Sequence, residues 1–335
     1  MKRLLLRRAA LLPVLLLGVV VFAFLLVHLT PGDPARQLAG GVTATPQQVE
    51  QTREEYGLDE PLPVQFVSYV GNLAQGNFGN SLAFKQSVGD LLAKRAPATI
   101  ELVAASLLIG IPVGLSLGIF AARRRDSFAD HLTSILSVAG LSLPLFWLAY
   151  MIVWLISVQL GWLPLGGRLP AFTELDSITG INPIDAALQG EWAILGESLR
   201  YLVLPALTLA IVPVALIARF ARASYIEVLG QDYIRTARAY GVRERDITWK
   251  QATKNALLPL ITLFGVLIPA MLIAAVLSEV VFSWQGVGNL LLGAMQNRDY
   301  AVVESIVLMI GFICVVANAL VDVSYALLDP RIRYS

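Results

Sequence analysis

Few residues in this chain have the types and spacing that catalysis needs. Gly114-Leu-Ser-Leu-Gly118 matches the Gly-x-Ser-x-Gly elbow of serine hydrolases. That elbow needs a preceding strand and a histidine partner. Here it lies in Leu102 to Ala122, a run of 21 residues without Asp, Glu, Lys or Arg, which we expect to be a membrane-spanning helix. Gly110, Gly114 and Gly118 recur every four residues, so we predict a smooth helix face for close packing instead.

Nucleotide and metal chemistry are equally poorly supported. No Gly-Lys dipeptide occurs, so the chain has no Walker A loop to hold nucleotide phosphates. Cys314 is its only cysteine, His28 and His131 are far apart, and no His-Glu-x-x-His occurs. An intramembrane aspartyl protease would need two buried aspartates, and only Asp322 is a candidate. We therefore predict no catalytic residue, no metal and no cofactor in this chain.

Two acids lie within or at the edge of apolar runs, Glu279 and Asp322. A charge at the bilayer centre costs about 2.5–3.5 kcal/mol on insertion scales, so both should face protein or water. One interpretation is a polar lining of a substrate path, with Asn318, four residues before Asp322, as a partner. The other is an interfacial acid near a helix end, hydrogen-bonded to a neighbour. The sequence leaves both open for Glu279 and favours the second for Asp322.

Composition points to the membrane. The chain has 335 residues, of which 56% are hydrophobic and only 15% charged, which is too apolar for a soluble domain. Its net charge of +1 is no sign of a nucleic-acid partner. We expect an all-α membrane protein with six spanning helices, at residues 9–32, 102–122, 132–160, 201–218, 256–278 and 305–321. Prolines inside these runs should kink them: Pro112, Pro144, Pro205, Pro213 and Pro269.

Basic residues are distributed unevenly between the two sides of such a protein. Six spans put both termini on one side, which then carries 17 Lys and Arg against 8 on the other. Cytoplasmic loops carry the excess of positive charge, so we expect both termini and the 219–255 segment in the cytoplasm. Residues 33–97 are then extracytoplasmic. Thr45-Pro-Gln-Gln48 there has the form of a capping box, and the helix it begins should end near Gly57.

The 219–255 segment is the longest charged stretch between two apolar runs, with eight basic and four acidic residues. It is predicted to form helix, turn and helix. Tyr233, Ala237 and Tyr240 fall on one helical face, and Gly241 is expected to take positive φ as a C-terminal cap. Asp246 and Lys250 are spaced for an ion pair within the second helix. A simple explanation of the charge is a positive-inside anchor.

More specific sequences accompany this charge. Tyr233-Ile-Arg-Thr-Ala-Arg-Ala-Tyr-Gly-Val242, followed by Asn255-Ala-Leu-Leu-Pro259, resembles the coupling loop of ABC-transporter permeases. The distance from Gly241 to Pro259 is similar to that in the dipeptide/oligopeptide/nickel branch. Further stretches resemble the same family, and they extend over nearly the whole chain: Thr30-Pro-Gly-Asp-Pro34, Trp284-Gln-Gly-Val-Gly288, Asn297-Arg-Asp-Tyr300 and Leu328-Asp-Pro-Arg-Ile-Arg333.

The resemblance implies the type I importer permease (MetI-like) fold and a division of the chain. Residues 1–32 would hold the first transmembrane helix, 33–97 an extracytoplasmic region, 98–329 the transmembrane core with the coupling loop 219–255, and 330–335 a cytoplasmic tail. The resemblance also implies that nine residues couple the chain to an ATPase: Tyr233, Arg235, Thr236, Ala237, Arg238, Ala239, Tyr240, Gly241 and Val242.

The partners implied are a second permease subunit in a heterodimer, two cytoplasmic subunits that bind ATP and Mg²⁺, and an extracytoplasmic substrate-binding protein. The cargo implied is a di- or oligopeptide, carried across the cytoplasmic membrane by alternating access. Nickel complexes, glutathione or another small solute remain alternatives. A different class, an ATP-independent secondary transporter or channel, would need no coupling loop.

Overall fold

A computed structural model describes the backbone of residues 2–328 except 30–32, 34, 37–38, 40–43, 56 and 82. Side chains of residues 2–10, 26–29, 55, 258 and 322–328 lie outside the description as well. The described chain is helical, and its strands are two residues each: β1 (Asn80–Ser81) pairs antiparallel with β2 (Gln86–Ser87). The prediction of an all-α protein is confirmed.

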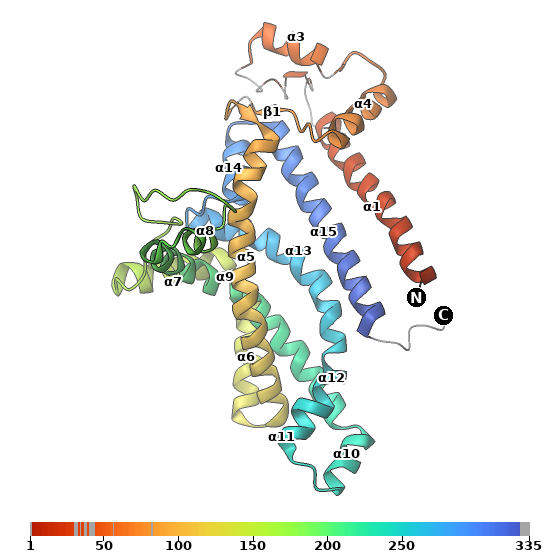
Figure 1. Cartoon of the computed structure of the whole chain (residues 1–335), viewed down its shortest axis with the longest axis vertical. Helices are drawn as coiled ribbons and strands as arrows, with labels where there is room; N and C mark the ends of the chain where they lie inside the picture. Colours follow the sequence, from red (N-terminus) through yellow and green to blue (C-terminus); the bar gives the residue numbers. More distant parts are fainter. Residues whose placement is uncertain are drawn as a thin grey trace.

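Among the residues that the structure describes, four helices are long and apolar enough to cross a membrane (Figure 1). They are α5 (Val88–Arg123), α9 (Trp192–Leu229), α13 (Leu258–Val281) and α15 (Tyr300–Leu328). In α1 (Lys2–Leu29), a shorter stretch, Leu11–Leu25, is described as apolar. A fifth span arises if one bent helix pair counts as a crossing. The number six therefore stays a prediction.

The expected third span, residues 132–160, is broken at Pro144, where the sequence predicted a kink. The structure divides it into α6 (Phe128–Ser142) and α7 (Leu145–Ile152), which continues as the π-helix η2 (Val153–Gln159), with a bend of 104° between the two parts. The cause is Pro144, because a residue before proline is disfavoured in the helical region. Leu143 accordingly has extended φ and ψ of −80° and 135°.

Helices α5 and α9 pack along the glycine stripe that the sequence predicted. A Cβ at Gly110 would lie 2.6 Å from Pro213, one at Gly114 2.9 Å from Ile217, and one at Gly118 2.6 Å from Ala221. These partners recur every four residues on α9, so the two helices run in the same direction with matched repeats. The predicted packing face is confirmed, and the Gly-x-Ser-x-Gly sequence lies inside a helix.

Short helices gather at the two ends of this bundle. At one end are α3 (Pro46–Glu55) and α4 (Leu62–Ala74), and at the other α10 (Asp232–Ala239), α11 (Glu244–Asp246) and α12 (Thr253–Ala256) (Figure 1). The capping box that begins α3 is confirmed, because the Thr45 amide donates to the Gln48 side chain and the Gln48 amide to the Thr45 hydroxyl. Its predicted end is also confirmed, since α3 stops at Glu55 and Gly57 has φ of 58°.

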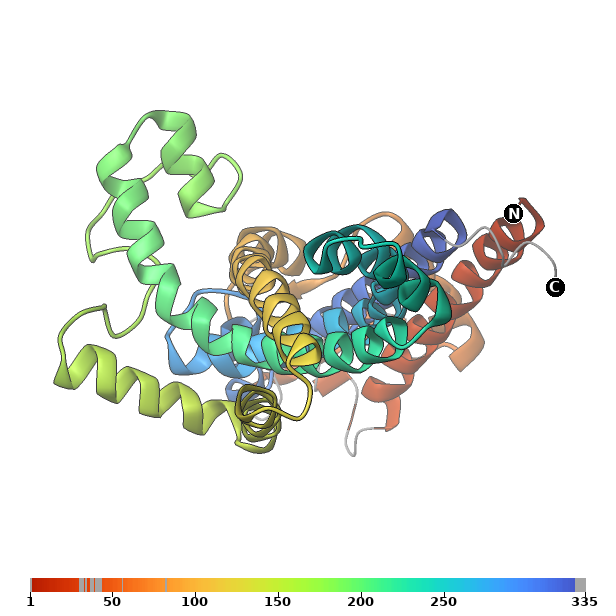
Figure 2. The same cartoon turned by 90° about the horizontal axis from the view of Figure 1, so that it is seen from below.

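The first and last long helices, α1 and α15, lie side by side and run antiparallel (Figure 1). Their ends at Lys2 and Leu328 point toward the side where α10–α12 lie. At one side of the bundle, α7 with η2 and α8 (Asn182–Gln189) with the first turns of α9 project outward, and Figure 2 shows from below that these two projections diverge. The main core lies between α5, α9 and α13, where Leu102, Leu267, Met271 and Trp284 are buried.

Candidate functional site

The turn after α10 has the geometry that the sequence predicted. Gly241 has φ of +76°, and its amide donates to the carbonyl of Arg238 at 2.9 Å. The next amide, of Val242, donates to the carbonyl of Ala237 at 3.1 Å. These two bonds form a Schellman motif, which satisfies the last carbonyls of α10 and needs a residue that accepts positive φ. The prediction of a glycine cap is confirmed.

The residues predicted to share one face of α10 differ in exposure, and only Ala237 among them is buried. Ile234 and Ala237 are 0% and 9% exposed and pack with Tyr225 of α9 and Ile247 of the π-helix η3 (Ile247–Ala252). Tyr240, expected on this face, is 84% exposed. The reason is that α10 ends at Ala239, so the helical spacing no longer applies at Tyr240.

The outer face of α10 is formed by other members of the predicted coupling set. Arg235, Thr236, Ala239 and Tyr240 are all exposed. Because Ala239 carries only a methyl group, a second protein can approach the helix backbone closely there. Ala239 is therefore the accessible alanine of α10, whereas Ala237 faces the chain's own core.

Hydrogen bonds tie α10 and the end of α9 to α12, which leads directly into α13. The Asn255 amide donates to the Tyr233 hydroxyl at 2.9 Å. The Ser224 hydroxyl donates to the carbonyl of Ala256, and the Tyr225 hydroxyl donates to the hydroxyl of Thr253. Sequence reasoning noticed the Asn255 motif but assigned it no contact. The segment is thus a braced unit that connects two long helices.

Ion pairs hold the surface of the same segment. Arg238 contacts Glu244 at 2.7 Å, and this bond lowers the pKa of the Glu244 carboxyl below its ordinary value. Lys250 contacts Asp246 at 2.8 Å, so the predicted i,i+4 pair is confirmed. A further pair, which sequence reasoning missed, joins Asp130 of α6 to Arg222 of α9. No sequence motif marks it, because 92 residues separate the partners.

At the opposite end of the long helices, Glu279 is fully buried near the end of α13. The Thr99 hydroxyl donates to its carboxylate at 2.6 Å. The amides of Gly288 and Asn289 donate to it at 2.7 and 3.2 Å, in the first turn of α14 (Val287–Gln296). Glu279 therefore caps α14, as a carboxylate at a helix N-terminus does. These contacts match the second interpretation, an acid near a helix end held by hydrogen bonds.

The packing around this cap explains why the Trp-x-Gly-x-Gly motif has glycines at positions 286 and 288. A Cβ on Gly286 would overlap the Glu279 carboxylate, and one on Gly288 would lie 2.5 Å from the backbone of Val276. The tryptophan of the motif, Trp284, is fully buried and donates its indole N–H to the carbonyl of Ala98 at 2.8 Å. The motif therefore fixes the turn between α13 and α14 against α5.

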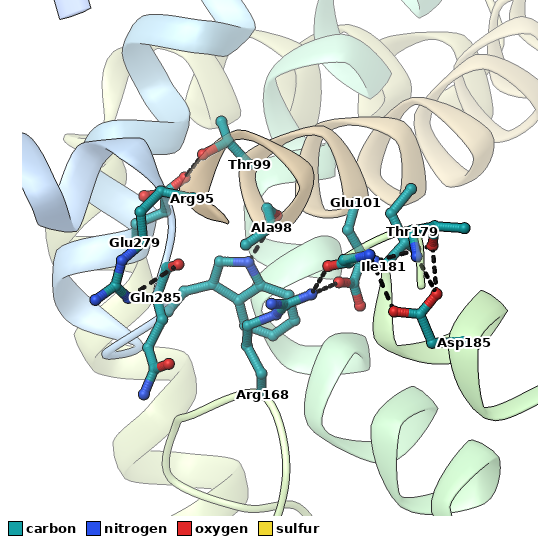
Figure 3. Close-up of polar contacts among 12 residues, drawn as sticks. Arg95, Ala98, Thr99, Glu101, Arg168, Thr179, Ile181, Asp185, Glu279 and Gln285 are labelled. Atoms are coloured by element: carbon teal, nitrogen blue, oxygen red, sulfur yellow. Dashed lines mark hydrogen bonds and ion pairs between the residues drawn. The ribbon is translucent and has the colours of Figure 1, made fainter. Parts of the chain in front are cut away.

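A buried ion pair adjoins this turn (Figure 3). One nitrogen of Arg168 donates both to the carboxylate of Glu101 on α5 and, at 2.8 Å, to the carbonyl of Gly180. Its guanidinium carbon lies 5.5 Å from the centre of the Trp284 ring. The carboxylate of Asp185 holds the same loop by accepting from Thr179 and Gly180. Burial alone would raise the pKa of Asp185, but these hydrogen bonds lower it.

The remaining predicted path residues lie elsewhere. Asn318 is exposed, and its side-chain oxygen lies 2.9 Å from the Cβ position of Gly265 near the start of α13. Gly265 precedes Glu279 by 14 residues on one helix, a separation of about 21 Å. Asn318 and Glu279 are therefore not brought together. The side chain of Asp322 lies outside the described residues.

Nothing in the described part of the chain assembles a metal site, since no three His, Cys, Asp or Glu side chains there are grouped to hold an ion. The ring of His131 bonds the carbonyl of Ser127 in its own helix turn. What the structure does assemble is a braced, exposed helix at one end and a buried polar clasp at the other, joined by long helices. Such an arrangement can transmit movement between two ends.

Comparison with known proteins identifies a family for this arrangement. Residues 114–334 match the family model of the binding-protein-dependent transport system inner membrane component, and residues 1–103 match the model of the N-terminal part of such membrane components. The chain is similar to the di/tripeptide transport system permease protein DppB of Pseudomonas aeruginosa (strain UCBPP-PA14), with 40% identity over 98% of both chains. It is 36% identical to the dipeptide transport system permease protein DppB of Escherichia coli (strain K12), over 100% of this chain and 99% of that one.

Proposed function

Because the chain belongs to the family of binding-protein-dependent transport system inner membrane components, we propose that it carries di- or oligopeptides as the permease subunit of an ATP-binding-cassette importer. The observation that carries the choice of cargo is the similarity, over nearly its whole length, to permeases named for dipeptides and tripeptides. The family supports a multi-pass protein of the inner membrane, and it supports dependence on a substrate-binding protein.

The finer assembly is part of the proposal. A second permease subunit, two ATPase subunits that bind ATP and Mg²⁺, and an extracytoplasmic binding protein complete the importer, and this chain itself catalyses nothing. Both termini and α10–α12 face the cytoplasm. The excess of basic residues on that side supports this orientation. In whole cells, a membrane-impermeant thiol reagent should label a cysteine at Gln47 but not one at Arg245.

The braced segment suggests how ATP hydrolysis moves the spans. Helix α9 is 38 residues long and continues out of the apolar core directly toward α10. The bonds from Tyr233 to Asn255 and from Ser224 to Ala256 connect that end to α12, and through it to α13. When closing ATPase subunits displace α10, both helices are displaced with it. The spans then open the peptide path toward the outside, which is alternating access.

Reconstitution tests this function. The chain is assembled in proteoliposomes with its second permease and ATPase subunits, and uptake of a radiolabelled dipeptide is measured with its binding protein outside and ATP inside. We expect uptake that requires ATP and is competed by unlabelled peptides but not by nickel or glutathione. Uptake without ATP would identify a secondary transporter or channel, and competition by nickel or glutathione alone would overturn the peptide assignment.

A further inference from the structure

A pocket of about 470 Å³ lies between the ends of α5 and α9 and the inner side of the α10–η3 segment. Its wall is apolar at Ile226 and Leu229. Its charged lining residues are Arg123, Arg125, Arg238 and Glu244. A lining with an apolar wall and several guanidinium groups is matched by a ligand that has both hydrocarbon and an anionic group.

The level of the pocket relative to the membrane indicates which kind of ligand fits it. Arg123 directly follows the uncharged run 102–122, so it lies where the hydrocarbon layer ends. Gly118 packs against Ala221, which places Ile226 at about the same level on the neighbouring helix. The pocket is therefore at the level of the lipid headgroups. On the proposed orientation, this is the inner leaflet.

Charge favours an anion there. Three guanidinium groups face one carboxylate, that of Glu244, which already contacts Arg238. The C-terminal ends of α5 and α9 each add about half a negative charge, which leaves a net positive charge of about one. Arg125 approaches its neighbour Asp126 only at 3.5 Å, with both side chains largely exposed, so that pair is weak.

The arginine triplet is divided between two roles. Arg123 and Arg125 line the pocket, whereas the guanidinium of Arg124 lies 4.6 Å from the centre of the Phe120 ring. We propose that the pocket binds an anionic phospholipid, with its phosphate between Arg123 and Arg125 and its glycerol and first acyl carbons against Ile226 and Leu229. Basic pockets between spanning helices bind such headgroups at the cytoplasmic surface. The bound lipid would bridge α5 to the α10 segment through Arg238.

Native mass spectrometry tests this site on the assembled transporter in nanodiscs that contain phosphatidylglycerol and phosphatidylcholine. Arg123→Gln with Arg125→Gln removes two pocket charges. Arg124→Gln with Arg219→Gln removes two exposed arginines outside the pocket and is the matched control. We expect phosphatidylglycerol affinity to fall about 25-fold in the first variant, roughly fivefold for each cation, and to stay within about twofold of wild type in the second.

Equal retention of phosphatidylglycerol by both variants would overturn the site. So would loss of the ATPase subunits from the first variant with lipid retention unchanged, since the pocket would then be a contact with the ATPase. Co-purification of the second permease subunit checks that each variant is folded. Lipid retention is measured without peptide or ATP, so a failure of the peptide assignment would leave this result unchanged.

Discussion

Asn255 donates a hydrogen bond to the hydroxyl of Tyr233 at 2.9 Å, across 22 residues of sequence. Each residue begins one of the two stretches that resemble a coupling loop. The bond therefore joins the two halves of the motif into one unit, with α10 on one side and α12, which leads into α13, on the other. A force on α10 is transmitted to α13 through this bond. It is transmitted to α9 through the polypeptide chain.

The first prediction removes that bond. Tyr233→Phe deletes one hydroxyl and should weaken the brace by about 0.5–1.5 kcal/mol. We expect severalfold slower peptide uptake with normal ATPase binding, because docking is kept while transmission is impaired. Tyr150→Phe, which deletes a hydroxyl from an exposed tyrosine of α7 outside this segment, should leave uptake unchanged. Equal uptake by the two variants in proteoliposomes would mean that the brace does not transmit force.

A second prediction concerns the positive φ of Gly241, which is +76°. Gly241→Val places a β-branched side chain in a conformation that costs about 1–2 kcal/mol even for an ordinary residue, so the end of α10 should unwind. Gly241→Asn is the control, because asparagine tolerates this region. We expect valine to abolish uptake without loss of membrane insertion, and asparagine to preserve most of it. A fully active valine variant would show that the cap is dispensable.

Glu279 provides a test of stability. Glu279→Ala leaves the amides of Gly288 and Asn289 and the hydroxyl of Thr99 without their acceptor. Each buried donor left without an acceptor costs about 1–3 kcal/mol. We therefore expect the free energy of unfolding to fall by about 3 kcal/mol or more and the thermal midpoint to be several degrees lower. Glu174→Ala, at an exposed loop position, is the matched control. If the thermal midpoints of the Glu279→Ala and Glu174→Ala variants agree within error, Glu279 does not stabilise the protein as a cap of α14.

The pair of Arg238 and Glu244 predicts a pH dependence. Arg238 lowers the pKa of Glu244 in the folded protein, so the pair contributes stability above the ordinary carboxyl pKa and loses it as pH falls through the lower, folded value. We expect ¹³C NMR of labelled glutamate to give a Glu244 pKa below 4.5, the ordinary value, and Arg238→Gln to return it toward 4.5. An unchanged pKa in that variant would mean that the pair does not hold α10 to α11.

Features set by neighbouring residues could be predicted from the sequence. The glycine stripe on α5, the Thr45 capping box, the cap at Gly241 and the pair of Asp246 and Lys250 all depend on contacts within a helix turn or on a helical repeat. Their physical causes act over a few residues. For this reason the sequence pattern predicted them without knowledge of the fold.

Features that depend on distant partners could not be predicted in the same way. Thr99 and Glu279 are 180 residues apart, so no local pattern revealed the cap of α14 or the need for Gly286. Helical spacing grouped Ala237 with Tyr240, but it does not show where a helix ends or which face meets the chain's own core. Pro144 was recognised as a kink, yet the 104° bend depends on how α7 packs.

The central claim is that the exposed face of α10 docks on an ATPase subunit, and Ala239 tests it most directly. A photo-crosslinking amino acid is placed at Ala239 in the assembled transporter and, as a control, at Leu188, which is 64% exposed on α8 at the side of the bundle. We predict that illumination joins the Ala239 variant, and not the Leu188 variant, to an ATPase subunit, at a yield that changes when ATP is added. Absence of an ATPase adduct from Ala239, with the complex intact, would contradict the coupling role and leave the segment as a positive-inside anchor.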